Sequence, residues 1–302
     1  MIRLVYYLLL KPLSLLPLRV LFLLSDFLYI LLYKILRYRI GVVDSNLKNS
    51  FPQLSQRERN LIRDKFYHHL FDIVVESIKI FSITAEESKK RFVVVNPEIL
   101  DRFFEEGRSV IIVGGHYNNW EMLAVGVAHY FKHEPMAIYH PMRSKFLNDK
   151  MVASRGQFGL KMVSRSETKS FFANLKKPTA NIFGADQSPS MSKKVYWTRF
   201  LNQDTPVMFG PEKFGTENNY PVVFGAVSKV KRGYYKFDLT LLYDNPASTA
   251  YGEITEAHTH LLEKQIIEAP EYWLWTHKRW KRTRRPEEIN EPKTVEDQLS
   301  GL

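Results

Sequence analysis

The alternation of short apolar runs with helical patterns between residues 110 and 184 constrains the fold of this chain more than any other feature. Four of the runs have the length of buried strands, at Val110–Val113, Met136–Tyr139, Lys161–Ser164 and Thr179–Gly184. The stretches between them have the spacing of helices, over residues 119–131, 144–158 and 166–176. Because strands separated by helices need crossover connections, the pattern predicts an α/β fold with a mostly parallel central sheet flanked by helices.

The C-terminal third has a different pattern, which predicts an antiparallel extension of this sheet. Val222–Val227 and Lys236–Leu242 flank a short glycine-containing turn and are typical of a hairpin. Two further helices are predicted, over residues 55–81 and 251–268. Since no repeat or low-complexity linker interrupts these elements, residues 41–286 are predicted to form one domain. The polar residues 287–302 are expected to form a flexible tail.

The first forty residues are dense in leucine and aromatic side chains, and Asp26 is the one acidic residue among them. Pro12 and Pro17 interrupt a continuous helix. The cleanest apolar stretch, Leu18–Leu36, approaches the roughly 20 residues that cross a bilayer. A buried core helix is the alternative, although soluble helices rarely have apolar side chains on all sides. We therefore predict that residues 1–40 form a membrane anchor that spans the bilayer or lies in its interface.

The net charge of +11 favours an acidic partner, which could be nucleic acid, an acidic carrier protein or an anionic lipid surface. The basic and aromatic run Tyr272–Arg285 is compatible with nucleic-acid binding and equally with a membrane interface. An apolar segment in the same chain favours lipid, so we expect no nucleic-acid partner. The absence of cysteine from the sequence excludes disulfides, thiol nucleophiles and zinc–thiolate sites.

The segment 110–121, with the sequence VIIVGGHYNNWE, contains the candidate catalytic residues. The predicted strand leads into Gly114 and Gly115, which permit a tight turn and a close approach of a ligand to the backbone. His116 follows on this turn, and either of the next two asparagines is a good helix N-cap. Glu121 is therefore expected in the first turn of the following helix.

This arrangement supplies the parts of a general-base site. The Glu121 carboxylate is expected to reach back to the His116 imidazole and fix its tautomer, so that the other ring nitrogen can take a proton from a hydroxyl group. The N-terminus of the helix would offer backbone N–H groups to a developing oxyanion. Since the segment has a base but no nucleophile of its own, it suits direct transfer of an acyl group to a bound alcohol.

On these residues the chain resembles the late acyltransferases of lipid A biosynthesis, within the wider lysophospholipid acyltransferase group. The family's His-x4-Asp/Glu motif corresponds to His116 and Glu121. Other matching segments are residues 148–156 (NDKMVASRG), 184–187 (GADQ), 205–211 (TPVMFGP) and 275–281 (WTHKRWK), together with the apolar N-terminus. The resemblance extends over residues 1–286, and the joint order of these motifs is more specific than any one of them.

The resemblance implies that His116 is the general base and Glu121 its partner, and that Arg155, Asp186 and Gln187 lie near the polar substrate. It also implies acyl carrier protein as the donor, a phosphorylated glycolipid such as a lipid A precursor as the acceptor, and the bacterial inner membrane as the location, with the site on its cytoplasmic side. The sequence departs from the family at 212–214, where Glu, Lys and Phe replace small apolar residues.

Other functions are also compatible with the sequence. The same chemistry could act on a lysophospholipid or on an amino-acid lipid of the ornithine type. A non-catalytic tether that binds anionic lipid or nucleic acid through Tyr272–Arg285 is a further alternative. His129 and His133 have the spacing of paired metal ligands, but no third ligand accompanies them, so neither a metal nor another cofactor is expected.

Overall fold

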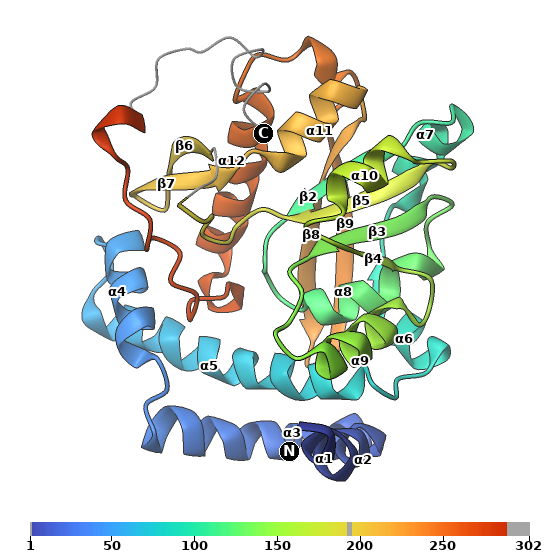
Figure 1. Cartoon of the computed structure of the whole chain (residues 1–302). Helices are drawn as coiled ribbons and strands as arrows, with labels where there is room; N and C mark the ends of the chain where they lie inside the picture. The colour runs from blue at the N-terminus through green and yellow to red at the C-terminus, as the bar shows by residue number, and fades with distance from the viewer. Residues whose placement is uncertain (1, 192–194, 289–302) are drawn as a thin grey trace.

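A seven-stranded sheet organises the computed structural model, which describes residues 2–191 and 195–288 (Figure 1). In spatial order its strands are β1 (Phe92–Val94), β9 (Tyr234–Tyr243), β8 (Val222–Lys231), β2 (Val110–Gly114), β5 (Thr179–Gly184), β3 (Glu134–Tyr139) and β4 (Lys161–Ser164). Neighbouring strands run parallel, except that β8 and β9 form an antiparallel hairpin. The predicted α/β class, with a mostly parallel sheet and an antiparallel C-terminal extension, is confirmed.

Strand β2 lies near the centre of the sheet and is buried on both faces. Val110 and Ile112 belong to one hydrophobic core, whereas Ile111 and Val113 belong to the core on the opposite face. This is the alternation of a strand, in which successive side chains point to opposite sides. Because both sides are covered, the strand reads in the sequence as an uninterrupted apolar run, which explains why it was recognisable.

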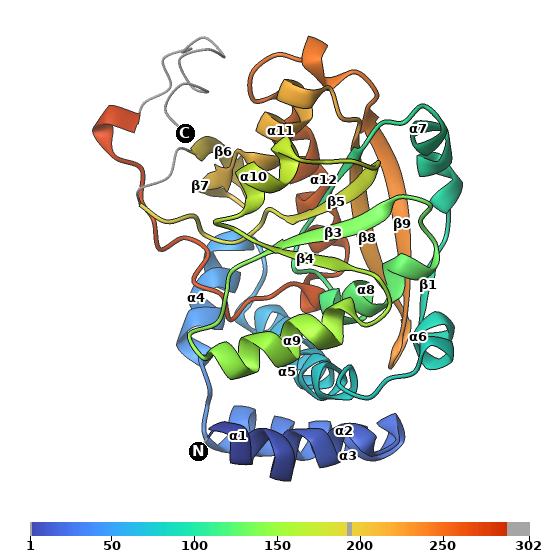
Figure 2. The same cartoon turned by 45° about the vertical axis from the view of Figure 1, so that its right-hand side comes forward.

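Helices cover both faces of the sheet (Figures 1 and 2). One core contains side chains from α8 (Trp120–Gly126), and the core on the other face contains side chains from α10 (Thr168–Ala173) and α12 (Glu253–Glu268). The remaining α-helices of the domain are α4 (Ile40–Ser50), α5 (Gln56–Lys79), α6 (Ala85–Arg91), α7 (Asp101–Glu105), α9 (Lys145–Gly156) and α11 (Gly210–Asn218). Short 3₁₀ turns are η3 (Pro97–Leu100), η4 (Val127–His129), η5 (Pro246–Ser248), η6 (Pro270–Tyr272) and η7 (Pro286–Glu288).

A separate antiparallel hairpin, β6 (Val195–Phe200) and β7 (Gln203–Met208), was not predicted from the sequence. Its two-residue turn places Leu201 at φ 49° and Asn202 at φ 63°. Hairpin turns with positive φ usually contain glycine, which is missing here, so the local signal was weak. Tertiary contacts hold the turn instead, since the Asn202 amide donates a 2.9 Å hydrogen bond to the Ser50 carbonyl oxygen at the end of α4.

The N-terminal residues form a layer beneath α5 (Figures 1 and 2). The layer consists of α1 (Ile2–Val5), the π-helical η1 (Tyr6–Leu10), α2 (Lys11–Leu15), α3 (Leu18–Leu28) and the π-helical η2 (Tyr29–Ile35). Within residues 2–191 and 195–288, no helix is both long and apolar enough to cross a membrane. The predicted anchor is therefore not confirmed as a spanning segment.

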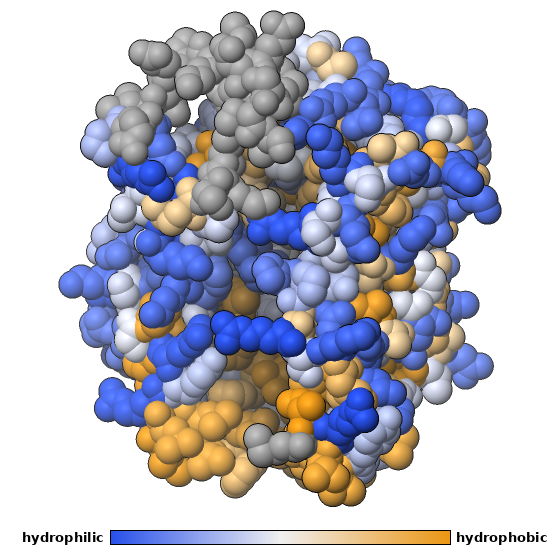
Figure 3. Space-filling view, in the orientation of Figure 1, coloured by the Kyte–Doolittle hydropathy of each residue, from blue (hydrophilic) through white to orange (hydrophobic). Residues whose placement is uncertain are grey.

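One side of this layer belongs to the protein core. Leu18 and Leu21 are buried against Val75 of α5, and Tyr29 and Tyr33 are part of a larger aromatic core. The opposite side exposes large apolar side chains to an unusual degree. This exposed N-terminal face consists of Leu4, Leu8, Leu15, Leu23, Phe27, Ile30, Ile35 and Leu36, each more than half exposed. Figure 3 shows it as an apolar band along the lower edge of the molecule.

The C-terminal aromatic and basic run is folded into the domain, so its interpretation as a membrane-interface or nucleic-acid segment is wrong for its central residues. Trp273 is 2% exposed and Trp275 is 0% exposed, and both lie in the core that contains Tyr29 and Tyr33. Arg279 is buried as well. Residues 289–302, most of the predicted flexible tail, lie outside the described residues.

The departure from the family pattern at residues 212–214 has a structural explanation. The buried Glu212 carboxylate accepts hydrogen bonds from the backbone N–H groups of Gly252 and Thr255, at the start of α12. A carboxylate in this place satisfies donors that the first turn of a helix leaves without partners. Phe214 stacks on Phe172 with a centroid distance of 4.3 Å. Two of these three side chains therefore join α11 to α12 and α10.

A pair of leucines in α3 distinguishes the buried side of the N-terminal layer from its exposed side. Leu21→Ala should lower the free energy of unfolding by about 2–5 kcal/mol, because it removes a fully buried side chain and leaves a cavity. Leu23→Ala, at a position that is 68% exposed, should change it by less than about 0.5 kcal/mol. Urea denaturation followed by circular dichroism measures both, and equal effects would show that the layer does not pack as described.

Candidate functional site

Two neighbouring strands bring the central residues of the site together. The parallel register pairs Gly114, the last residue of β2, with Gly184, the last residue of β5. His116 and Asp186 each follow two residues after their strand, so they emerge side by side at the carboxyl edge of the sheet. Open α/β sheets hold ligands outside this edge.

His116 and Asp186 form a closely hydrogen-bonded pair. The imidazole Nδ1 lies 2.7 Å from Oδ1 of Asp186, and the backbone N–H of His116 donates to Oδ2 over 2.8 Å. The indole Nε1–H of Trp273 donates to the same Oδ2 over 2.9 Å. The prediction that Glu121 fixes the imidazole is therefore wrong, because the carboxylate bonded to Nδ1 belongs to Asp186.

Burial and charge shift the pKa values of this pair in opposite directions. Burial alone would raise the pKa of Asp186, but the His116 charge and three hydrogen bonds outweigh it and lower the pKa to about 2. Burial alone would lower the pKa of His116, but the Asp186 carboxylate outweighs it, so that the pKa is raised above its ordinary value of 6.5. The His116 side chain remains 24% exposed, whereas that of Asp186 is 3% exposed. The imidazole is thus the member of the pair that a ligand can reach.

Glu121 forms a different ion pair at the rim of the site. It lies in the first turn of α8, and Arg155 lies in the last turn of α9. The Arg155 Nε–H donates to Oε2 of Glu121 over 2.9 Å, and Nη2 donates to Oε1, which makes the contact bidentate. Both charges influence the pKa of His116, which Glu121 raises and Arg155 lowers. Arg155, predicted near the polar substrate, therefore has a carboxylate partner within the protein.

Gln187 completes the surroundings of the imidazole. Its amide nitrogen lies 3.3 Å from Nε2 of His116, the ring nitrogen that Asp186 does not hold. The indole ring of Trp120 meets the imidazole edge to face, with a centroid distance of 5.2 Å. The structure therefore brings His116, Asp186 and Gln187 together, and the carboxylate that bonds the imidazole is that of Asp186.

The glycines of the site are required by close packing within the protein. A Cβ atom on Gly114 would lie 2.6 Å from the Gly225 carbonyl oxygen. One on Gly115 would lie 2.8 Å from Leu262 and 3.2 Å from Oδ2 of Asp186. One on Gly184 would lie 2.9 Å from the His116 ring. A protein contact thus accounts for each glycine, including the two that were predicted to admit a ligand.

Three backbone N–H groups at the start of α8, where an oxyanion site was predicted, already have hydrogen-bond partners. The Asn119 side-chain oxygen accepts hydrogen bonds from the N–H groups of Glu121, at 3.0 Å, and of Met122, at 2.9 Å. The N–H of Asn118 donates to the Tyr272 carbonyl oxygen over 2.9 Å. These three donors have partners within the protein and are therefore not available to an oxyanion.

The family of bacterial lipid A biosynthesis acyltransferases matches residues 1–282, nearly the whole chain. The chain belongs to this family. It is 23% identical over 253 residues to the lipid A biosynthesis palmitoleoyltransferase of Escherichia coli (strain K12), covering 82% of this chain and 80% of the relative. The lipid A biosynthesis acyltransferase of Shigella flexneri has the same identity and coverage. The protein is therefore an enzyme that transfers acyl groups.

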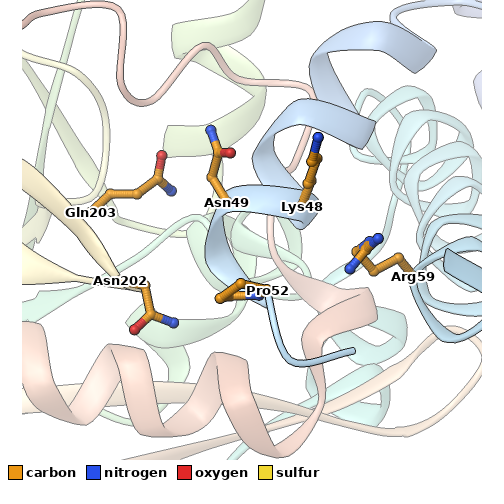
Figure 4. Close-up of a pocket in the computed structure, with 6 residues that line it drawn as sticks. All are labelled: Lys48, Asn49, Pro52, Arg59, Asn202 and Gln203. Atoms are coloured by element: carbon orange, nitrogen blue, oxygen red, sulfur yellow. The ribbon is translucent and has the colours of Figure 1, made fainter. Parts of the chain in front are cut away.

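A pocket of about 500 Å³ lies where α4 and the start of α5 meet the turn between β6 and β7 (Figure 4). Two cations and three carboxamides line it, together with Pro52; these are Lys48, Arg59, Asn49, Asn202 and Gln203. The Arg59 guanidinium is held by the Phe51 and Leu54 carbonyl oxygens. The lining contains no carboxylate, so the pocket suits an anionic ligand.

The hydrogen bond between His116 and Asp186 predicts the pH dependence of the acyltransferase. A general base must be neutral, so kcat/KM should rise with pH through a midpoint above 6.5, the ordinary pKa of histidine. Asp186→Asn removes the charge that raises the His116 pKa, and should move the midpoint to lower pH while reducing turnover by about 10²–10⁴-fold.

Glu121→Gln is the matched control, because it removes a carboxylate that contributes less to the His116 pKa. Its midpoint should move downward by less than that of Asp186→Asn. A larger shift in Glu121→Gln would contradict the pairing of His116 with Asp186. The pH–rate profiles of the three purified proteins measure these midpoints.

Proposed function

We propose that this acyltransferase moves a fatty acyl chain from a thioester on acyl carrier protein to a hydroxyl group of a lipid A precursor. The observation that carries the proposal is the state of the imidazole at the sheet edge. Asp186 holds Nδ1 of His116, which leaves Nε2 as the nitrogen that accepts a proton. The names of both relatives, which refer to lipid A biosynthesis, support this class of acceptor.

The reaction proceeds by direct attack of the acceptor on the donor. Nε2 of His116 takes the proton of the acceptor hydroxyl as its oxygen forms a bond to the thioester carbonyl carbon. The carbonyl oxygen becomes an oxyanion in a tetrahedral intermediate. When the carbon–sulfur bond breaks, the leaving sulfur receives the proton from the imidazolium, which restores neutral His116. The buried Asp186 stays ionised and stabilises the imidazolium between these two steps.

The residues around the imidazole have supporting roles in this proposal. The Gln187 amide, 3.3 Å from Nε2, is placed to donate a hydrogen bond to a reacting oxygen. The bidentate contact of Arg155 orients the Glu121 carboxylate and leaves the remaining N–H groups of the guanidinium for a polar substrate. The two ion-paired residues thus act on the substrate side of His116, and Asp186 acts from behind it.

The positive charge of the protein supports the proposal that its substrates are anionic. The net charge of +11 favours an acidic carrier protein and a phosphorylated acceptor. The pocket at Lys48 and Arg59 supports the same class, since its carboxamides can bond sugar hydroxyls while its cations bind phosphate. Lysophospholipids and ornithine-type lipids have smaller headgroups and are the alternative acceptors.

We further propose that the exposed N-terminal face lies flat in the cytoplasmic leaflet of the bacterial inner membrane. Its apolar side chains would enter the acyl region, as in interfacial helices that bind without spanning. Arg3, Arg19, Lys34 and Arg37 are exposed on the same segments, where they can meet anionic headgroups. This arrangement brings the enzyme to a lipid acceptor without a membrane-crossing helix.

The enzymatic proposal predicts acyl transfer to a phosphorylated glycolipid by the purified protein. With labelled acyl carrier protein as donor, a lipid A precursor should be acylated faster than a lysophospholipid or an ornithine-type lipid. His116→Ala should reduce turnover by about 10²–10⁴-fold, the usual contribution of a general base. Thin-layer chromatography of the labelled lipids measures each rate.

His260→Ala is the control for the loss of a histidine, since His260 is 63% exposed on α12 and should be dispensable. Thermal melts of both variants establish that they are folded. Near-normal activity of folded His116→Ala would refute the mechanism, and faster acylation of another acceptor would refute the substrate assignment.

The membrane proposal predicts that the exposed N-terminal face is needed for lipid binding. A double variant, Leu23→Asp and Phe27→Asp, introduces charge at positions that are 68% and 56% exposed. It should fold normally yet sediment at least tenfold less with vesicles that contain anionic lipid, because charged side chains do not enter the acyl region.

A matched variant places the same charges elsewhere on the surface. Val230→Asp and Ile267→Asp alter two large apolar residues, 55% and 57% exposed, that lie outside the N-terminal layer. This protein should sediment with vesicles like the wild type. Equal losses in both double variants would mean that net charge, rather than the N-terminal face, controls binding.

A further inference from the structure

Arg279 is a buried cation that the proposed reaction does not use. Its side chain is among the largest that are fully buried, with the residue 1% exposed. Nη2 donates to the Pro206 carbonyl oxygen in β7 over 2.7 Å. Among the residues that the structure describes, Nε and Nη1 have no hydrogen-bond partner. A buried guanidinium without a bonded carboxylate costs several kcal/mol, so its charge must be compensated in another way.

The compensating charge is that of Asp186. Burial lowers the pKa of Arg279 to about 10, and the Asp186 carboxylate is the charge that opposes this change. Arg279 therefore remains a cation at neutral pH. The buried His258, whose pKa burial lowers to about 3, is neutral and offers no charge of its own. Burial lowers the pKa of His277 to about 4; the Asp186 charge opposes this change and the Arg279 charge adds to it.

A small cavity connects these groups. It is lined by Ala185, Asp186, Phe200, Val207, His258, Thr259, Leu262 and Arg279. Its volume of about 10 Å³ has room for about one water molecule. Nε2 of His258, a residue 3% exposed, also has no partner among the described residues. Two buried polar side chains with unused nitrogen atoms thus line one cavity beside the Asp186 carboxylate.

The hydrogen-bonding capacity of Asp186 fits this cavity. An ionised carboxylate has about four acceptor positions, and three are used by His116 and Trp273. A water molecule in the cavity can accept a hydrogen bond from Arg279 and donate one to Asp186. Its second hydrogen can meet the neutral imidazole of His258. One water would therefore satisfy groups that are otherwise costly to bury.

We propose that Arg279 is a positioning residue of the acyltransferase, which acts through one water molecule in this cavity to offset the charge of Asp186. A buried carboxylate 2.7 Å from an imidazole strongly favours the imidazolium. If nothing opposed it, His116 would be protonated before the acceptor bound and could not act as a base. The fixed positive charge of Arg279 behind Asp186 limits this effect and keeps His116 able to accept a proton.

The test is the titration of His116 in a pair of variants, measured by NMR on protein with isotope-labelled histidine. Arg279→Gln removes the charge but can still donate to the Pro206 carbonyl oxygen, whereas Arg279→Lys retains a cation. The His116 pKa should be higher in Arg279→Gln than in the wild type by roughly half a unit to one unit, and nearly unchanged in Arg279→Lys. The acid limb of kcat/KM should shift upward by the same amount.

Arg284→Gln is the matched control, because its side chain is 28% exposed and lies 3.8 Å from Asp204 at the surface. It should leave the His116 pKa unchanged. A purely structural role for Arg279 predicts lower thermal stability in both of its variants with no change in the His116 titration, and that result would overturn the proposal. A shift of equal size in Arg284→Gln would also overturn it.

If Arg279→Gln does not fold, Arg279→Met carries the test, because it also removes the charge and places no new polar group in the cavity. The His116 pKa should rise in this variant as in Arg279→Gln. A His116 titration identical to that of the wild type would overturn the proposal. This inference rests on the proposed role of His116 as base, but the NMR titration needs no substrate. Failure of acyl transfer and failure of the Arg279 proposal are therefore distinguishable.

Discussion

The Asp186 carboxylate holds the site together, because it binds groups from two parts of the chain that are distant from its own. It accepts both the backbone N–H and the imidazole of His116, after β2, and the indole N–H of Trp273, near the C-terminus. These contacts depend on the register in which Gly114 pairs with Gly184. A slip of one residue in either strand would turn its side chains to the opposite face and separate the imidazole from the carboxylate.

Helix α5 connects the N-terminal layer with this site. Asp72 accepts a 2.8 Å hydrogen bond from Ser25 of α3. One helical turn further on, the buried Glu76 accepts hydrogen bonds from Tyr235 of β9 and from Asn119, the cap of α8. Burial raises the pKa of Glu76 to about 7. The surface proposed to meet lipid and the helix that presents Glu121 therefore share one rigid support.

Helix α9 makes a second connection between the same two regions. Near its start, Phe146 packs edge to face on Tyr6 with a centroid distance of 5.5 Å, and at its end Arg155 binds Glu121. Both helices therefore join the N-terminal layer to the site. The buried Leu21 and Tyr33 add to the packing of this layer against the protein core.

Much of the fold and part of the site could be predicted from the sequence alone. Runs such as Val110–Val113 determine strands because their side chains must be buried on both faces, and the helices between them determine that the strands run parallel. The positions of His116 and Asp186 shortly after two predicted strands were also present in the sequence. Which strands are neighbours, however, was decided only by the tertiary structure, since strand order depends on how helices pack on the two faces. For the same reason the tertiary structure alone assigned Asp186 to the imidazole and Glu121 to Arg155, and buried Trp273 and Arg279 behind them. Hydrogen bonds between residues far apart in the chain leave no local pattern in the sequence, because they depend on the distance between the residues in the folded structure.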